Sequence, residues 1–198
     1  LMIGHTAGNI LGALLFHPPA MQVLKDGPLG LYDGMAVVYF AMATVMSLLA
    51  AHLRGNYLTR AGCLFAIYYG VATLQALIEA IYFNSYLKLA DSTLWLIGVG
   101  NLLGSIPAVA LGTWLWKGRE GAPDPLSGHL WKAPAIALLY VFTYFAAGTL
   151  IAWQGEAVRA YYQQAAHIDV RELALLQVAR GLLWGAMAWI GARWIGGG

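Results

Sequence analysis

Two charged residues, Glu79 and Arg180, lie inside long apolar stretches of the sequence. An ionised side chain in such surroundings needs water or an opposite charge, and inside a membrane it marks a candidate functional site. Glu79 is four residues from the end of its stretch at Phe83, and Arg180 is seven residues from the end at Leu173, on the same side. At 1.5 Å per residue their depths differ by about 5 Å, so we predict an ion pair.

Amide side chains are predicted to surround this pair. On two of the stretches a glutamine lies one helical turn from the charged residue, on the same face of the helix. Asparagines at similar depth on two other stretches complete a polar cluster that would bind a solute or ion. The alternative is a purely structural cluster that only fixes the register of the helices, with hydrogen bonds that contribute about 1 kcal/mol each. The predicted binding residues are Glu79, Arg180, Gln177, Gln75, Asn9 and Asn101.

The composition indicates which elements must position these residues. Hydrophobic residues make up 60% of the chain and charged residues only 10%, against roughly a quarter in a soluble domain. A membrane-spanning helix needs about 20 apolar residues. We therefore predict an all-α integral membrane protein, a bundle of six transmembrane helices that forms a single domain over residues 1–198. The predicted spans are residues 1–16, 31–53, 61–83, 94–116, 133–153 and 173–195.

The first of these spans is short. Because the chain opens on Leu1 and not on methionine, we expect further residues to precede it. A cleaved signal peptide is the alternative for this segment, but no basic region begins it and no small-residue cleavage site precedes His17. We therefore predict a spanning helix.

The basic residues predict the orientation. Six spans place both termini on one side of the membrane, called face A, with face B opposite. Face A carries six basic residues and face B four, so the positive-inside rule predicts that face A and both termini are cytoplasmic, in a bacterial inner (plasma) membrane. The basic residues are Arg54, Arg60, Lys117, Arg119, Lys132 and Arg193 on face A, and Lys25, Lys88, Arg159 and Arg171 on face B.

Small residues recur in the first and fourth spans. Gly4, Gly8 and Gly12 line one face of the first, and residues 100, 104, 108 and 112 are Gly or Ala in the fourth, which predicts that these two helices form the tightly packed centre of the bundle. Residues 8–12 (GNILG) are also similar to residues 100–104 (GNLLG). Three spans separate the two segments, as in the 3+3 inverted repeats of many transporters. Chance similarity in a biased composition is the alternative.

A further helix is predicted in the loop between the last two spans. Val158, Tyr161, Tyr162 and Ala165 follow the i, i+3, i+4, i+7 spacing of an amphipathic helix. Their apolar side would lie on the membrane surface, with Glu156 and other polar residues opposite. We therefore expect a short interfacial helix on the outer face.

Several classes of site are not expected. The net charge of +2 is small and the basic residues are scattered, which argues against nucleic acid as a partner. Cys63 is the only cysteine, so no disulfide framework or cysteine metal site is predicted. The histidines form no i, i+4 pair or His-Glu motif, so neither a metal nor another cofactor is expected.

Three functions stay open at this stage. The first is a small-molecule or ion transporter, favoured by the inverted repeat and by helices interrupted by glycine and Pro107. The second is an accessory or assembly subunit, in which the lipid-facing surface packs on a larger membrane complex or on a second copy. The third is an intramembrane enzyme in which Glu79 acts as acid or base and Arg180 binds an anionic group. The lipid bilayer is the expected surrounding in all three, and no residue is assigned as catalytic.

Overall fold

The computed structural model describes residues 2–19, 31–119, 121–122, 131–151, 154–156, 159–160 and 169–195. The interfacial helix expected in the last loop rests on Val158, Tyr161, Tyr162 and Ala165, which lie outside these residues. That expectation therefore stays a prediction.

The described part of the chain is all-α, as predicted, and contains no sheet. It forms six helical segments, two of which are interrupted by a π-helical stretch. The elements are α1 (Met2–Phe16), α2 (Leu31–His52), α3 (Tyr57–Tyr69), η1 (Gly70–Leu74), α4 (Gln75–Tyr82), α5 (Asn84–Leu87), α6 (Asp91–Trp95), η2 (Leu96–Gly100), α7 (Asn101–Leu115), α8 (Lys132–Leu150) and α10 (Val170–Ile195).

Four of these segments are long and apolar enough to cross a membrane, by length and composition. They are α3 to α4, α6 to α7, α8 and α10. The stretches Thr6–Phe16 of α1 and Ala36–His52 of α2 are apolar but shorter. The structure therefore supports an integral membrane protein with four candidate spans, while the first and second spans stay predictions.

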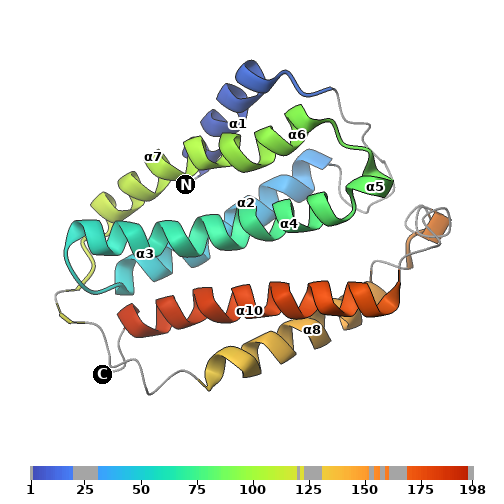
Figure 1. The fold of residues 1–198 in the computed structure, drawn as a ribbon. Helices are drawn as coiled ribbons and strands as arrows, with labels where there is room; N and C mark the ends of the chain where they lie inside the picture. Colours follow the sequence, from blue (N-terminus) through green and yellow to red (C-terminus); the bar gives the residue numbers. More distant parts are fainter. Residues whose placement is uncertain are drawn as a thin grey trace.

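The helices are arranged around α3 and α4, which cross the middle of the molecule (Figure 1). The pair α1 and α6–α7 lies on one side, the pair α8 and α10 lies on the other, and α2 passes behind. The apolar core lies where α2, α3 and α7 meet, in the half of the helices nearer face A. Its buried residues are Met46, Ala50, Leu53, Cys63, Leu64, Ile67, Tyr68 and Val109.

The first and fourth spans pack closely on each other. They do not form the predicted centre of the bundle, because α3 and α4 cross the middle while α1 and α7 lie on one side (Figure 1). A Cβ atom added to Gly8 of α1 would overlap the backbone of Gly104 and would lie 2.7 Å from the carbonyl oxygen of Gly100. Only glycine therefore permits this approach of the two helices. The glycines of the shared GN-x-LG pattern belong to this contact, because Gly8 and Gly12 lie against Gly104 and Gly100.

A second close crossing, between α8 and α10, was not predicted. A Cβ atom on Gly181 would lie 2.7 Å from the carbonyl oxygen of Ala137, and one on Gly185 would lie 2.7 Å from that of Ala133. The backbones of α8 and α10 are therefore also in close contact, though less close than those of α1 and α7 at Gly8. This contact fixes which side chains of α8 reach the face of α10 that carries Arg180.

The packing gives the 3+3 inverted repeat no support. Such a repeat would make the contact between the third and fourth spans equivalent to that between the sixth and first. In the structure α3 packs on α7, whereas α10 and α1 lie on opposite sides of the molecule (Figure 1).

The fourth span is interrupted at η2 and not at Pro107, through which α7 continues. A π-helical turn disturbs the regular backbone hydrogen bonds, so its carbonyl groups accept from other donors. The hydroxyl of Tyr69 donates to Gly98 O at 3.0 Å, and Nδ2 of Asn101 donates to Ile97 O at 2.8 Å. These two side chains tie η2 to α3 and to its own helix.

The α1–α7 crossing generates a prediction about stability. Gly8→Ala should lower the free energy of unfolding by about 1 to 3 kcal/mol, because the added methyl group overlaps backbone atoms that cannot move aside. Gly62→Ala is the matched control, since nothing lies within 4 Å of a Cβ atom there. It should be neutral or stabilising by up to about 1 kcal/mol, because alanine has the higher helix propensity. Unfolding in mixed micelles measures both, and equal stabilities would contradict the packing.

Candidate functional site

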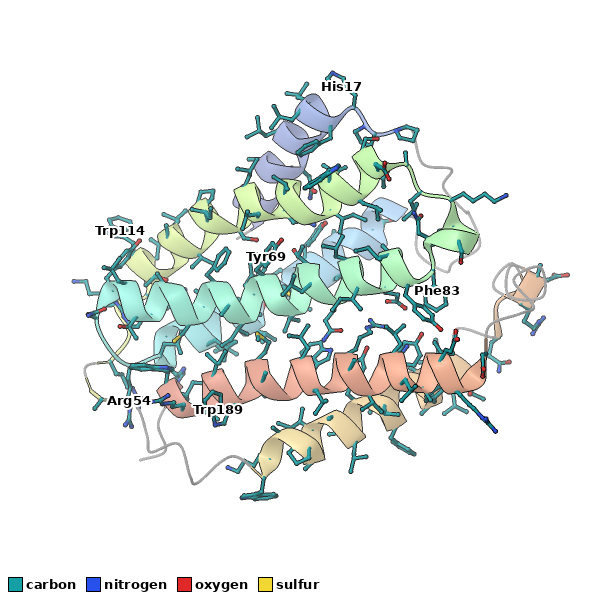
Figure 2. The ribbon with its side chains drawn as sticks, viewed as in Figure 1. His17, Arg54, Tyr69, Phe83, Trp114 and Trp189 are labelled. Atoms are coloured by element: carbon teal, nitrogen blue, oxygen red, sulfur yellow. The ribbon has the colours of Figure 1, made fainter. Side chains whose placement is uncertain are left out.

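The predicted ion pair between Glu79 and Arg180 is confirmed. Nη2 of Arg180 lies 2.9 Å from Oε2 of Glu79, and the contact joins α10 to α4. Polar side-chain atoms lie between these two helices, near the end of α4 where Phe83 is labelled (Figure 2). The pair therefore lies in the half of the bundle nearer face B, away from the apolar core.

Two glutamines hold the rest of the Arg180 guanidinium group. Nε of Arg180 donates to Oε1 of Gln75 at 3.0 Å, and Nη1 donates to Oε1 of Gln177 at 3.2 Å. Gln75 is itself fixed, because its Nε2 donates to the backbone carbonyl of Arg180 at 2.9 Å. Four of the six predicted site residues therefore meet in one network, with Arg180 at its centre.

Two tyrosines of α8 complete this network. Cζ of Arg180 lies 5.7 Å from the ring centroid of Tyr140 and 5.5 Å from that of Tyr144, at cation–π distance. The Tyr144 hydroxyl lies 3.5 Å from Oε1 of Glu79, and the Tyr140 hydroxyl lies 3.5 Å from Oε1 of Gln177. We call these six residues the Arg180 cluster: Gln75, Glu79, Tyr140, Tyr144, Gln177 and Arg180.

Neither tyrosine was predicted from the sequence. A signal was present, because Tyr140 and Tyr144 are an i, i+4 pair inside the fifth span, on one face of a helix. The contact of Gly181 with Ala137 turns that face toward Arg180. Nothing in the sequence shows this contact, because it depends on which two helices approach most closely.

The π-helical stretch η1 decides which side chains of the third span enter the cluster. An uninterrupted α-helix would place Tyr68 and Gln75 on one stripe, as residues seven apart. The N–H of Gln75 instead donates to the carbonyl of Gly70, five residues earlier, and the extra residue turns the helix by about 100°. Tyr68 therefore points into the apolar core, while Gln75 and Glu79 face α10.

Asn9 and Asn101, the other two predicted site residues, are not in the Arg180 cluster. Asn101 binds the carbonyl of Ile97 in its own helix, and Asn9 lies half-buried on α1 beside Gly8. Helices α1 and α7 are on the far side of α3 and α4 from α10 (Figure 1). Matching depth placed these asparagines at the right level of the bundle but on the wrong side of it.

The members of the cluster differ sharply in exposure. The side chain of Arg180 is 8% exposed, and that of Glu79 is 36% exposed. Gln177 is fully buried, and its Nε2 has no hydrogen-bond partner among the described residues. The cluster thus presents one accessible carboxylate, beside a buried cation and a buried N–H donor that has no partner among the described residues.

The groups of the cluster determine the chemistry that it can perform. The formal charges of Glu79 and Arg180 cancel, so the site as a whole is neutral. It carries donors, acceptors and aromatic rings, which are groups that bind and orient a solute. Its six residues contain no serine, threonine, cysteine or histidine; of the residue types that form covalent intermediates in enzymes, the cluster holds one glutamate and two tyrosines. In the described part of the chain, no three His, Cys, Asp or Glu side chains gather as a metal site requires.

The ion pair generates a prediction about stability. Glu79→Leu should lower the free energy of unfolding by about 3 to 5 kcal/mol, because it leaves the buried Arg180 guanidinium without its counter-charge. The double variant Glu79→Leu with Arg180→Met should be clearly more stable than the single one, since no uncompensated charge is left. Unfolding in mixed micelles measures the difference. A double variant as unstable as Glu79→Leu would show that the charges do not stabilise each other.

Comparison with known proteins reveals no relative of this chain. No family model, no curated protein and no solved structure matches it. The function is therefore inferred from the geometry of the Arg180 cluster.

Proposed function

We propose that the protein is an integral membrane transporter of a small solute, with the Arg180 cluster as its binding site. The observation that carries the proposal is the unequal exposure of the ion pair, in which Arg180 is 8% exposed and Glu79 36%. In a pair that only sets helix register, both side chains are best buried, because a charge that faces hydrocarbon costs several kcal/mol. An accessible carboxylate is the arrangement that a binding site needs.

The surroundings of the cluster also favour transport. Both glutamines and Arg180 are held by hydrogen bonds to one another, so the buried part of the site is preorganised. The π-helical stretch η1 ends directly before Gln75, and such interruptions occur frequently at functional sites.

An accessory subunit is the second candidate, and one observation favours it. The long helix α8 buries only Ala137 among its described side chains. Leu138, Leu139 and Phe142 are strongly exposed on its surface. Lipid covers such a face in a transporter, whereas another membrane protein would cover it in an accessory subunit.

We further propose that face A is cytoplasmic. All described acidic residues lie in the half of the protein nearer face B: Asp33, Glu79, Asp91, Glu156, Asp169 and Glu172. The end of the bundle nearer face A carries basic residues. One of them, Arg60, donates a hydrogen bond from Nη1 to the carbonyl oxygen of Trp116 at 2.9 Å. The positive-inside rule concerns the basic residues alone, of which face A carries six and face B four. The Arg180 cluster would then lie in the outer half of a bacterial inner membrane.

The orientation gives a labelling prediction. In a protein whose Cys63 is replaced by alanine, Arg119→Cys should react with a membrane-impermeant maleimide only after the cytoplasmic side is opened. Lys88→Cys is the matched control and should react in intact cells, because both positions are exposed basic residues at opposite ends of the bundle. The reverse pattern would overturn the orientation.

The binding role gives a second prediction. Polar solutes are screened for stabilisation of the purified protein, where a ligand at a hundredfold its Kd adds about 2.7 kcal/mol. Stabilisation by a hit should be lost in Glu79→Gln and in Arg180→Lys, because both change the charges or donors of the cluster. Arg171→Gln, which alters an exposed charge on face B, is the control and should keep the effect.

Uptake of the same solute into proteoliposomes then decides the proposal. Uptake by the wild type and by Arg171→Gln, but not by Glu79→Gln, would support transport. A hit that the cluster variants still bind and carry would place the site elsewhere. Copurification of a stoichiometric membrane protein that protects α8 from labelling, with no solute bound, would favour the accessory role.

A further inference from the structure

A long apolar groove runs between α2 and α10. Its volume is about 630 Å³, within the range of about 300 to 1,000 Å³ that is typical of ligand sites. Apolar side chains line it almost throughout. They include Met42, Met46 and Leu49 of α2, and Trp184, Met187 and Ile195 of α10. From Trp184 to Ile195 the groove follows about 16 Å of helix, at 1.5 Å per residue.

The groove and the Arg180 cluster are joined along one face of α10. Gln177, Arg180, Trp184, Met187 and Gly191 follow one another at spacings of three or four residues, so they form a single stripe. Trp184 belongs to both sites, because it lines the groove and its ring centroid lies 6.1 Å from that of Tyr140. One helix face is therefore polar toward face B and apolar toward face A.

The polar end of this stripe restricts the charge of a ligand. The Glu79–Arg180 pair is neutral, so a ligand with a net charge would leave that charge uncompensated inside the membrane, at high cost. Gln177 Nε2 is buried without a partner among the described residues, and its orientation is fixed because Oε1 of the same amide accepts from Arg180. This N–H can donate to an acceptor oxygen of a ligand, and the accessible Glu79 carboxylate can bind a hydrogen-bond donor or a cation.

We infer that the substrate is an amphiphile with a single hydrocarbon chain and a zwitterionic head group. The cationic part of the head binds Glu79, its anionic oxygens accept from Gln177 and Arg180, and the chain lies in the α2–α10 groove. This inference rests on the proposed function, because it names the class of molecule that the transporter would carry. It adds the groove, which a small polar solute would not use.

Quenching of tryptophan fluorescence tests the inference on the purified protein in a maltoside detergent. The probe is a lysophosphatidylethanolamine with a brominated acyl chain, because bromine quenches tryptophan on contact. The saturable part of the quenching should be reversed by the unbrominated lipid and should be clearly smaller in Trp184→Phe. Exposed tryptophans such as Trp95, Trp114 and Trp131 contribute a background that does not saturate. Binding should weaken about tenfold or more in Ala188→Phe, which fills the groove, because the chain loses its buried apolar contacts.

Matched controls separate the groove from general lipid contact. Ala135→Phe adds the same side chain at an exposed position of α8 and should bind the probe as the wild type does. In the unaltered protein a hexanoyl analogue should bind much more weakly than the long-chain probe, which tests the groove without any substitution. Glu79→Gln should weaken binding of the zwitterionic probe, and brominated lysophosphatidylglycerol, whose head is anionic, should bind more weakly than the ethanolamine lipid.

The outcomes distinguish this inference from the proposed function. Equal binding of short and long chains, or of zwitterionic and anionic heads, would overturn the inference. Unchanged probe binding in Ala188→Phe together with unchanged quenching in Trp184→Phe would do the same. If a small polar solute binds the Arg180 cluster while the lipid probe does not, the transporter proposal stands and the inference of an amphiphilic substrate is wrong. If Glu79→Gln affects no ligand at all, both fail.

Discussion

The burial of one guanidinium group is the constraint on which this half of the structure depends. Arg180 lies on a helix that is otherwise apolar for most of its length, and its side chain is 8% exposed. Several kcal/mol would be lost if this cation had no partner, so the fold must deliver acceptors to it. Two other helices supply its partners. Helix α4 supplies the acceptors Glu79 and Gln75, and helix α8 supplies the aromatic rings of Tyr140 and Tyr144. The positions of α4 and α8 against α10 are thereby coupled.

Glycine contacts make this arrangement possible without themselves taking part in it. The approach of α8 to α10 at Gly181 and Gly185 brings the two tyrosines over Arg180. The approach of α1 to α7 at Gly8 and Gly104 builds the opposite side of the bundle, where no part of the cluster lies. Van der Waals packing of small residues therefore sets the frame, and one ion pair with its hydrogen bonds determines the register within half of it.

The sequence predicted the ion pair and its glutamines because charge inside an apolar run and depth along a helix can both be counted. It did not predict which helices are neighbours, since many arrangements place residues at equal depth. Asn9 and Asn101 were assigned to the cluster for that reason, and they lie on α1 and α7 instead, on the other side of the bundle. Nor could the sequence predict that Tyr68 faces the apolar core while Gln75, seven residues later, faces Arg180, because η1 inserts one residue into the helical turn and rotates the rest of the helix. Tyr140 and Tyr144 were missed because their role depends on the glycine contact of a different residue pair.

The central claim is that water and solutes reach the carboxylate of Glu79 while Arg180 stays enclosed. Carboxyl modification of the unaltered protein in liposomes tests it most directly, with a water-soluble carbodiimide and an amine nucleophile, and with mass spectrometry of the peptides. Asp91, which is exposed near face B, serves as the internal standard for complete reaction. We expect Glu79 to be modified at a measurable fraction of the Asp91 rate. Full modification of Asp91 with none at Glu79 would show that the pair is sealed inside the bundle, and would contradict a binding site there.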